Sequence, residues 1–306
     1  MKEIEITDIP PLSPGELSLL DLHSVLNTLN VLRSQLAMLG FLAADREDYF
    51  HEGLVVCDAL VRSVHDPVTA LREAARIDEY ERVVFAELAA KLVSPPAQPD
   101  PEELADAMAN LRAVFEILKV RAQEILARAA APDRWQIFNL PQLRADFMAA
   151  FAAIERHSRG RYHILFNAAR TEPQDYYIDF KLETAAGAPL MMPAVFTDVM
   201  RDLIANARKY TPPGGNILAA LYEDAAALRF VVADTGRGIP EDEIEPVVHF
   251  GKRASSVGDV RTLGGGFGLT KAFLVTKRFG GRFWIASEVG HGTRIRITIP
   301  QPVRSV

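Results

Sequence analysis

The chain has 306 residues, of which 49% are hydrophobic, and a formal net charge of −6. This length suggests about two domains, and the apolar share is large enough for packed cores, which excludes a disordered chain. The mild acidity gives no general attraction to nucleic acid. No apolar run approaches the ~18 residues of a membrane span, and the first residues lack the features of a signal peptide. We therefore expect a cytoplasmic protein with no membrane span and no nucleic-acid partner.

The first predicted domain is helical. Residues 1–12 are interpreted as an N-terminal tail. Ser13 and Glu16 are typical of a helix start, with Ser13 as the N-cap and Glu16 completing a capping box. An apolar seam with heptad spacing follows over residues 22–39, and a similar run over residues 50–64 comes after a very short link. Together the two runs predict an antiparallel helical hairpin.

Further helices extend this domain. A proline after Asp66 breaks or kinks the second helix, a third helix is expected to reach about Val93, and a proline after Asp100 opens a fourth. The fourth helix carries its own heptad seam over residues 104–125. We predict a helical domain over residues 13–131 and, because the seams offer more apolar face than one hairpin needs, a homodimer through it. An intramolecular four-helix bundle that buries every stripe within one chain stays open as an alternative.

Residues 132–306 change to a mixed pattern of strands and helices. Two alternating stretches, 161–167 and 176–183, are predicted to form a hairpin, and residues 192–210 to form a helix. Later strands flank a helix over residues 269–279. Strands beside helices in mixed order predict an α+β sandwich, with one sheet backed by helices. The predicted fold class is therefore two-domain, an all-α bundle followed by an α+β sandwich.

Four segments of the second domain contain residue types that suit a nucleotide. They are Asp202-Leu-Ile-Ala-Asn206 with Lys209 and Tyr210, Asp234-Thr-Gly236-Arg-Gly238, Gly264-Gly-Gly266-Phe-Gly268-Leu269, and Gly292-Thr293. An asparagine on a helix can complete the oxygen shell of Mg²⁺, and a lysine one turn further on can reach a phosphate. A carboxylate can accept a hydrogen bond from an exocyclic amine, and glycines let backbone N–H groups approach phosphates closely.

In this order and spacing, the four segments resemble the N, G1 and G2 boxes and the closing Gly-Thr of the Bergerat-type (GHKL) ATPase fold, in its sensor histidine kinase branch. The resemblance implies ATP and Mg²⁺ as cofactors. It implies that Asn206 binds Mg²⁺, that Lys209 binds a phosphate, and that Tyr210 lies against the adenine face. It also implies that Asp234 accepts a hydrogen bond from the adenine amino group, with Thr293 nearby through water.

The remaining implied site residues lie around the base and in the lid. The glycine-box residues, which permit the turn around the base or form the end of the lid, are Gly236, Gly238, Gly264, Gly266, Gly268 and Leu269. Lys252 and Arg253 follow a reduced F box at residues 247–250 and suit contact with the γ-phosphate. Asp202 stands where this superfamily carries Asn, His or an acid, and an acid there can serve as a general base.

A histidine kinase needs a histidine acceptor on an exposed helical face, and His23 in the first helix is the candidate. The family pattern places an acid directly after the histidine, and Thr, Asn or a small residue four positions on. Asn27 matches the second requirement, whereas Ser24 replaces the acid. Since that acid is thought to polarise the histidine, we predict slow autophosphorylation and a bias toward dephosphorylation of the partner.

The resemblance implies a histidine autokinase that passes phosphate to an aspartate on the receiver domain of a response regulator. Residues 66–131 intervene where relatives carry only the hairpin, and three interpretations of them are sensing, docking of a partner such as a separate sensor protein, and enlargement of a dimer interface. Two other functions stay open. One is a mitochondrial-type protein serine kinase that uses Asp202 as its base, and the other is an ATP-binding pseudokinase or signalling scaffold.

Overall fold

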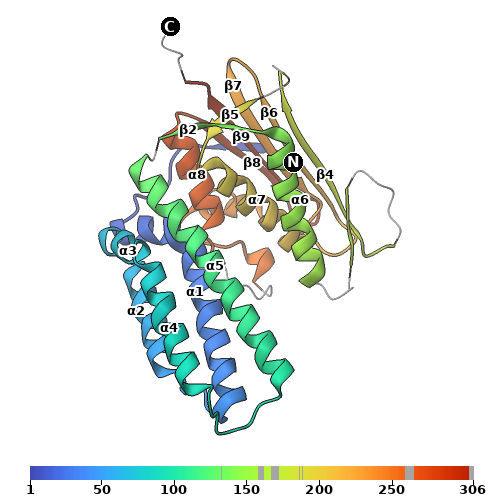
Figure 1. Ribbon diagram of the computed structural model, residues 1–306. Coiled ribbons are helices and arrows are strands. Elements are labelled where there is room, and N and C mark those ends of the chain that lie inside the picture. Colours follow the sequence, from blue (N-terminus) through green and yellow to red (C-terminus); the bar gives the residue numbers. More distant parts are fainter. Residues whose placement is uncertain are drawn as a thin grey trace. The chain divides into compact units, whose positions relative to one another are not determined.

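The computed structural model describes residues 1–131, 133–157, 162–166, 172–185, 187, 189–258 and 265–302. The chain divides into two compact units, a helical unit of Leu12–Pro132 and a mixed unit of Met1–Pro11 with Asp133–Val306. The predicted fold class, a helical bundle followed by an α+β sandwich, is confirmed (Figure 1). Within these described ranges, no helix combines the length and the apolar character that crossing a membrane requires.

The first residues belong to the mixed unit, which corrects the predicted tail over residues 1–12. Strand β1 (Glu3–Ile6) pairs antiparallel with β8 (Arg282–Glu288) at the edge of the main sheet. The isoleucines of β1 pack into the core of the mixed unit, and its glutamates bond to arginines, with Glu5 accepting from Nε of Arg282 at 2.9 Å. The alternation of Glu and Ile is typical of a strand. A strand of four residues is too short to indicate from sequence that it pairs with β8, which lies far along the chain.

The helical unit has five helices among its described residues. They are α1 (Pro14–Ala44), α2 (His51–Ser63), α3 (Pro67–Ala74), α4 (Ile77–Lys91) and α5 (Pro101–Ala130). The predicted capping box of Ser13 and Glu16 is present at the start of α1. The single third helix of the sequence prediction is two helices, α3 and α4, because the chain turns at residues 75–76.

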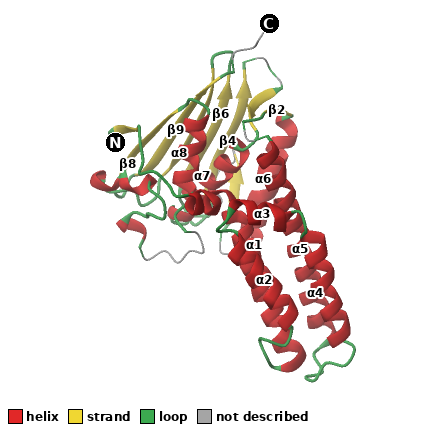
Figure 2. Ribbon diagram, turned by 90° about the vertical axis from the view of Figure 1, so that its left-hand side faces the viewer, coloured by secondary structure: helices red, strands yellow, loops and turns green. Residues whose placement is uncertain are grey.

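The two predicted heptad seams face each other within one chain. Helix α1 packs against α2 and α5, and α4 packs against the same two helices, so four helices close around one core (Figure 2). Leu29, Leu32 and Leu36 of α1 and Leu111 and Phe115 of α5 are at most 1% exposed. The intramolecular bundle is therefore the observed arrangement, and the seams on which the homodimer was predicted are already buried.

A buried carboxylate takes the place of an N-cap for α2. The N-cap residue Phe50 makes no side-chain capping bond. Instead Glu87 of α4, which is 6% exposed, accepts hydrogen bonds from the backbone N–H groups of Glu52 at 3.2 Å and Gly53 at 2.8 Å. Its charge is balanced by Lys91, whose Nζ lies 2.6 Å away. A carboxylate satisfies the unpaired donors of a helix N-terminus, so Glu87 joins α4 to α2.

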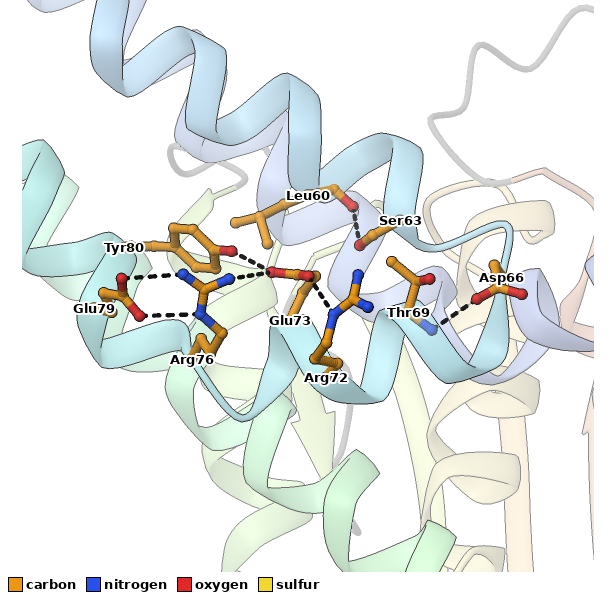
Figure 3. A network of polar contacts seen from close by, with 9 residues as sticks. All are labelled: Leu60, Ser63, Asp66, Thr69, Arg72, Glu73, Arg76, Glu79 and Tyr80. Carbon is orange, nitrogen blue, oxygen red and sulfur yellow. Dashed lines mark hydrogen bonds and ion pairs between the residues drawn. The ribbon is translucent and has the colours of Figure 1, made fainter.

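A polar network fixes the turn between α3 and α4 (Figure 3). Glu73 accepts hydrogen bonds from the hydroxyl of Tyr80 and from Nε of Arg72 at 3.0 Å, and it also pairs with Arg76. Arg76 in turn makes two bonds of 3.0 Å to Glu79. The network borders an open depression of about 440 Å³ on the helical unit. These bonds connect the end of α3 to the start of α4, so the network fixes the orientation of the short α3 relative to α4.

The mixed unit is built on a seven-stranded sheet. Its strand order is β1, β8, β9 (Gly292–Pro300), β7 (Ala227–Asp234), β6 (Asn216–Glu223), β4 (Tyr176–Thr184) and β3 (Ile164–Phe166). Helices α6 (Leu140–His157), α7 (Phe196–Tyr210) and α8 (Gly268–Arg278) cover one face (Figures 1 and 2). A separate two-stranded sheet pairs β2 (Trp135–Phe138) with β5 (Leu190–Pro193). Large apolar side chains such as Phe196, Phe230 and Phe283 fill the layer between sheet and helices.

Strand β3 pairs parallel with β4, which corrects the predicted hairpin. The buried carboxylate of Asp175 accounts for this arrangement. It accepts hydrogen bonds from the backbone N–H of His163 at 3.1 Å and from that of Glu172 at 2.9 Å. The N–H of Tyr176 also donates to the carbonyl of His163 at 2.9 Å. These bonds bring the start of β4 beside the start of β3, so the two strands run the same way.

Candidate nucleotide-binding site

Helix α7 presents Asn206 toward the start of α8. The apolar positions of α7, such as Leu203 and Ala207, are buried in the core, which leaves Asn206 half-buried on another side. Gly268 is the first residue of α8, and a Cβ added there would lie 2.8 Å from Nδ2 of Asn206. A larger residue at position 268 would displace the Asn206 side chain, so the N-box asparagine and the G2-box glycine lie against each other.

The side chains at this place fit a magnesium ion held together with phosphates. Mg²⁺ prefers oxygen ligands and keeps several waters, so one amide oxygen from Asn206 is enough beside the oxygens of a nucleotide. No group of three or more His, Cys, Asp or Glu side chains in the described part of the chain is arranged to hold a metal. A magnesium ion bound through the single amide oxygen of Asn206 would share its other ligands with a nucleotide and water.

Asp234 ends β7 and is held by two backbone donors. Its Oδ1 accepts from the N–H of Gly236 at 2.8 Å and from that of Thr293 at 3.3 Å, while among the described residues Oδ2 has no hydrogen-bond partner. Burial raises the pKa of the Asp234 carboxyl from 3.8 to about 6, although the two backbone hydrogen bonds act to lower it. One carboxylate oxygen is thus fixed and the other remains able to accept from a ligand.

Ser287 of β8 supports this site, and the sequence analysis missed it. Its hydroxyl lies 2.8 Å from the hydroxyl of Thr293 and donates to the carbonyl of Gly292 at 2.9 Å. It also accepts from the N–H of Ile239 at 2.8 Å. Ser287 therefore links the closing Gly-Thr to the G1 loop. The sequence held one indication of this role, because Ser287 is a buried polar residue that follows a run of buried apolar residues in β8. A single serine in a strand is too common to stand out.

The G1 loop depends on a glycine with a left-handed backbone. Gly238 has a φ of 70°, and a Cβ there would lie 1.9 Å from the carbonyl oxygen of Glu288. The preceding residue, Arg237, donates its N–H to the carbonyl of Tyr210 at 3.2 Å. The loop is thus fastened to β8 on one side and to the end of α7 on the other. It brings Asp234 and the last turn of α7 together.

Lys209 and Tyr210 complete the last turn of α7. The ring of Tyr210 packs partly against the core, and Nζ of Lys209 lies 4.9 Å from the ring centroid. This cation–π contact holds the ammonium group close to the helix end. Lys209 also lies one turn after Asn206, so both side chains belong to the same end of α7.

The lid is described only in part. Gly264 lies outside the described residues, whereas Gly266 has a φ of 76° and passes close to the carbonyl of Lys252. Phe250 of the reduced F box stacks on Phe267 of the G2 box, with ring centroids 4.7 Å apart. The stacking joins the two boxes, so the residues after the F box lie near the start of α8.

The remaining lid residues divide into exposed and packed ones. Lys252 and Arg253 are exposed, and Arg253 donates to the carbonyl of Val257 at 3.1 Å. Leu269 is partly buried and packs against the core of the mixed unit. It therefore anchors the first turn of α8.

Asp202 is engaged in an ion pair that the sequence did not suggest. Its Oδ2 lies 3.4 Å from Nζ of Lys271, a residue of α8 that is 4% exposed. The same ammonium lies 3.5 Å from Asp198, one turn earlier on α7. The two ion pairs of Lys271 therefore join α8 to α7.

His23 and Asn27 lie in the helical unit, on successive turns of α1. His23 is half-buried instead of exposed, and its Nδ1 lies 3.4 Å from the carbonyl oxygen of Leu20. Asn27 is half-buried as well. Ser24, at the position of the expected acid, contributes its carbonyl to the hydroxyl of Thr28 at 2.9 Å. The histidine predicted as acceptor thus lies in the helical unit, and the ATP motifs lie in the mixed unit.

Comparison with known proteins agrees with this site. Residues 193–303 match the family described as histidine kinase-, DNA gyrase B- and HSP90-like ATPase. That range includes all four motifs and the strands and helices that carry them. The mixed unit is therefore an ATPase domain of this kind, and the resemblance to sensor histidine kinases is confirmed for it.

The similar curated proteins are sensory kinases. The chain is 35% identical over 116 residues to the adaptive-response sensory kinase SasA of Synechococcus elongatus, covering 36% of this chain and 30% of that protein. It is 31% identical over 158 residues to SasA of Parasynechococcus marenigrum, covering 46% of this chain and 41% of that protein. The chain thus spans less than half the length of these relatives.

Solved structures of histidine kinases align with part of this chain. A mycobacterial sensor histidine kinase, MprB, aligns with 55% of this chain and 97% of its own at 20% identity, with a TM-score of 0.37. Full-length ShkA in complex with AMPPNP aligns with 64% of this chain and 39% of its own at 19% identity, with a TM-score of 0.39.

Proposed function

We propose that this chain is a cytoplasmic histidine kinase of a two-component system. In this proposal the mixed unit binds ATP with Mg²⁺, the γ-phosphoryl group is transferred to His23, and an aspartate on the receiver domain of a response regulator accepts it next. The observation that carries the proposal is Asp234, a half-buried carboxylate with one oxygen fixed by backbone donors and the other available to a base.

The adenine end of the site follows from these contacts. An exocyclic amine donates to a carboxylate, whereas the carbonyl that guanine carries at the same place would meet a like partial charge, so Asp234 selects adenine. The hydroxyl of Thr293, oriented by Ser287, suits a water-mediated contact beside it. Tyr210 offers a ring and Lys209 a cation at the end of α7.

The phosphate end depends on α7 and α8. Asn206 would hold Mg²⁺, which when bound neutralises part of the charge on the phosphates. The first turn of α8 presents unpaired backbone N–H groups, which together with the helix dipole favour an anion. Lys252 and Arg253 are exposed and can reach a phosphate. These residues would position the phosphates and neutralise their charge, which are the main contributions of a protein to phosphoryl transfer.

The phosphoacceptor in this proposal is His23, and Asn27 is the residue that would orient water during dephosphorylation. Ser24 in place of an acid favours slow autophosphorylation, so the resting balance would lean toward the phosphatase reaction. The ion pair with Lys271 counts against Asp202 as a general base, and therefore against a serine kinase of the mitochondrial type. A pseudokinase scaffold would bind ATP and leave His23 unmodified.

A homodimer through the helical unit remains part of the proposal, on a different surface. The buried seams leave Val31, Met38 and Phe41 of α1 at 42%, 42% and 49% exposure, and Val55 of α2 at 48%. An apolar stripe of this kind supports contact with a second copy. Light scattering of the wild type and of Met38→Glu tests it, since a dimer that uses this stripe should dissociate in the variant and a wild-type monomer at micromolar concentration would end the idea.

Two experiments test the central proposal. Calorimetry should find that Asn206→Ala loses Mg²⁺-dependent ATP binding and that Asp234→Ala loses the preference for ATP over GTP. A lost charged hydrogen bond should weaken binding by about ten- to hundredfold. Incubation with labelled ATP should give a phosphate that is lost in acid and survives base, and His23→Ala should remove it. A base-labile, acid-stable label would point instead to a serine kinase.

Two further variants test the proposed balance of activities. Ser24→Glu should speed formation of phosphohistidine, whereas Asn27→Ala should leave that rate alone and slow phosphate loss from the regulator. If Ser24→Glu leaves the rate of autophosphorylation unchanged, the argument from the missing acid is wrong.

A further inference from the structure

Lys271 is a buried cation outside the four motifs. It lies in the first turn of α8 and is 4% exposed, and its Nζ is 3.5 Å from Asp198 and 3.4 Å from Asp202. Lysine is almost never fully buried unless it is paired, because an unpaired ammonium loses its hydration without compensation. The position therefore needs an explanation beyond packing.

The ion pairs share a stripe of α7 with the predicted magnesium ligand. Asp198, Asp202 and Asn206 follow one another at one-turn spacing, so their side chains line the same side of the helix. Gly268, one turn before Lys271, passes close to the side-chain amide of Asn206 and to Cβ of Asp202. The first turn of α8 thus extends along α7 from the asparagine to the ion pairs.

A second cation belongs to this cluster. Arg201 also approaches Asp198, with NH1 3.8 Å from Oδ1, so two carboxylates face two cations. A nucleotide brings several negative charges to Asn206 and the N-terminus of α8. If Lys271 were absent, the carboxylate of Asp202 would lose this ion pair beside those phosphates, in a half-buried place where screening by salt is weak.

We propose that Lys271 is a positioning residue of the nucleotide site. Its ion pairs hold the first turn of α8 against α7 so that the helix N-terminus is presented to the phosphates, and its charge neutralises Asp202 beside them. This inference rests on the proposed ATP binding and adds the side chain that controls affinity for the triphosphate. The adenine end is built on Asp234 from β7 and does not depend on Lys271.

The test is to measure ATP and adenosine binding separately in Lys271→Met, which keeps the length of the side chain and removes its charge. Calorimetry with Mg²⁺ present should show ATP binding weakened by about tenfold or more and adenosine binding unchanged. Lys271→Arg should retain most of the ATP affinity. The matched control is Lys277→Met, which removes a half-buried lysine of the same helix that lies over the ring of Phe273, and it should change neither affinity.

A double variant separates the charge from the fold. Lys271→Met with Asp202→Asn also removes the carboxylate that Lys271 neutralises, so it should recover most of the ATP affinity. It carries the test if Lys271→Met alone does not fold. Unchanged ATP affinity in Lys271→Met, an equal loss for ATP and adenosine, or no recovery in the double variant overturns the inference. A wild type that binds no ATP in the same titration overturns the proposed function itself.

Discussion

The ionised carboxylate of Asp234 should lower the folding stability of the mixed unit. Burial raises its pKa from 3.8 to about 6, so the folded protein binds a proton there more tightly than the unfolded chain does. Its contribution to stability is therefore full below pH 4 and falls as the pH rises toward 6. A rise of about two units corresponds to about 3 kcal/mol, and because the side chain is only half-buried we expect about 1–2 kcal/mol.

The substitution Asp234→Asn tests this reasoning. Asparagine keeps an oxygen for the N–H groups of Gly236 and Thr293 and carries no charge. Without nucleotide, the variant should unfold with a free energy about 1–2 kcal/mol higher than the wild type at pH 7.5. The difference should shrink as the pH falls through 6 and vanish near pH 4. The same variant should bind ATP poorly, since an amide nitrogen cannot accept from the adenine amine.

Urea unfolding followed by tryptophan fluorescence measures the difference. Both tryptophans of the chain, Trp135 and Trp284, lie in the mixed unit, so the signal reports on the unit that contains Asp234. Asp224→Asn is the control with the opposite sign, because a hydrogen bond from Arg229 lowers the pKa of Asp224. That variant should lose stability at neutral pH and regain parity in acid. An Asp234→Asn variant no more stable than wild type at pH 7.5, or a difference independent of pH, would refute the argument.

Two more substitutions test the glycine turn and the buried cap. Gly238→Ala should cost about 2 kcal/mol or more and abolish ATP binding, because its Cβ would collide with the carbonyl of Glu288, and the same tryptophan signal with ATP titration measures both effects. Glu87→Ala should lower the unfolding free energy of the helical unit by about 2–3 kcal/mol, read from circular dichroism, since it removes the acceptor of the N–H groups at the start of α2 and the carboxylate that pairs with Lys91. Glu87→Gln should lose less, and an Ala variant as stable as wild type would contradict this role.

The parts of the fold that local chemistry determines could be predicted from the sequence. The capping box at Ser13 and the proline after Asp100 mark helix starts correctly, because N-capping involves residues within one turn. The ATP motifs were identified because their glycines and polar residues are required by backbone geometry and ligand chemistry at fixed spacing. Asn206, Asp234 and Gly268 accordingly lie in one unit, as the motifs indicate.

What could not be predicted depends on partners distant in sequence. Lys271 follows a glycine box in a helix and looks like a solvent-exposed residue, since lysine is usually exposed. Only the packing of α8 on α7 reveals the two aspartates beside it. The heptad seams predicted the helices correctly, but they were assigned to contact with a second copy and are buried within one chain. An apolar stripe shows that a helix face is buried and does not show whether the same chain or another chain covers it. Glu87 likewise has no signal for its capping role, since its donors belong to another helix.

The pairing of β1 with β8 has a consequence for how the chain matures. Glu3 faces Ala286 in that register, so β1 pairs with a strand that is synthesised much later than β1 itself. At roughly 5–20 residues per second, β1 waits for tens of seconds, and the bundle can close while the sheet is still incomplete. A fragment beginning at Asp133 would lack β1 and leave the edge of β8 open to other chains. Adding a peptide with the sequence of β1 to such a fragment should restore its solubility.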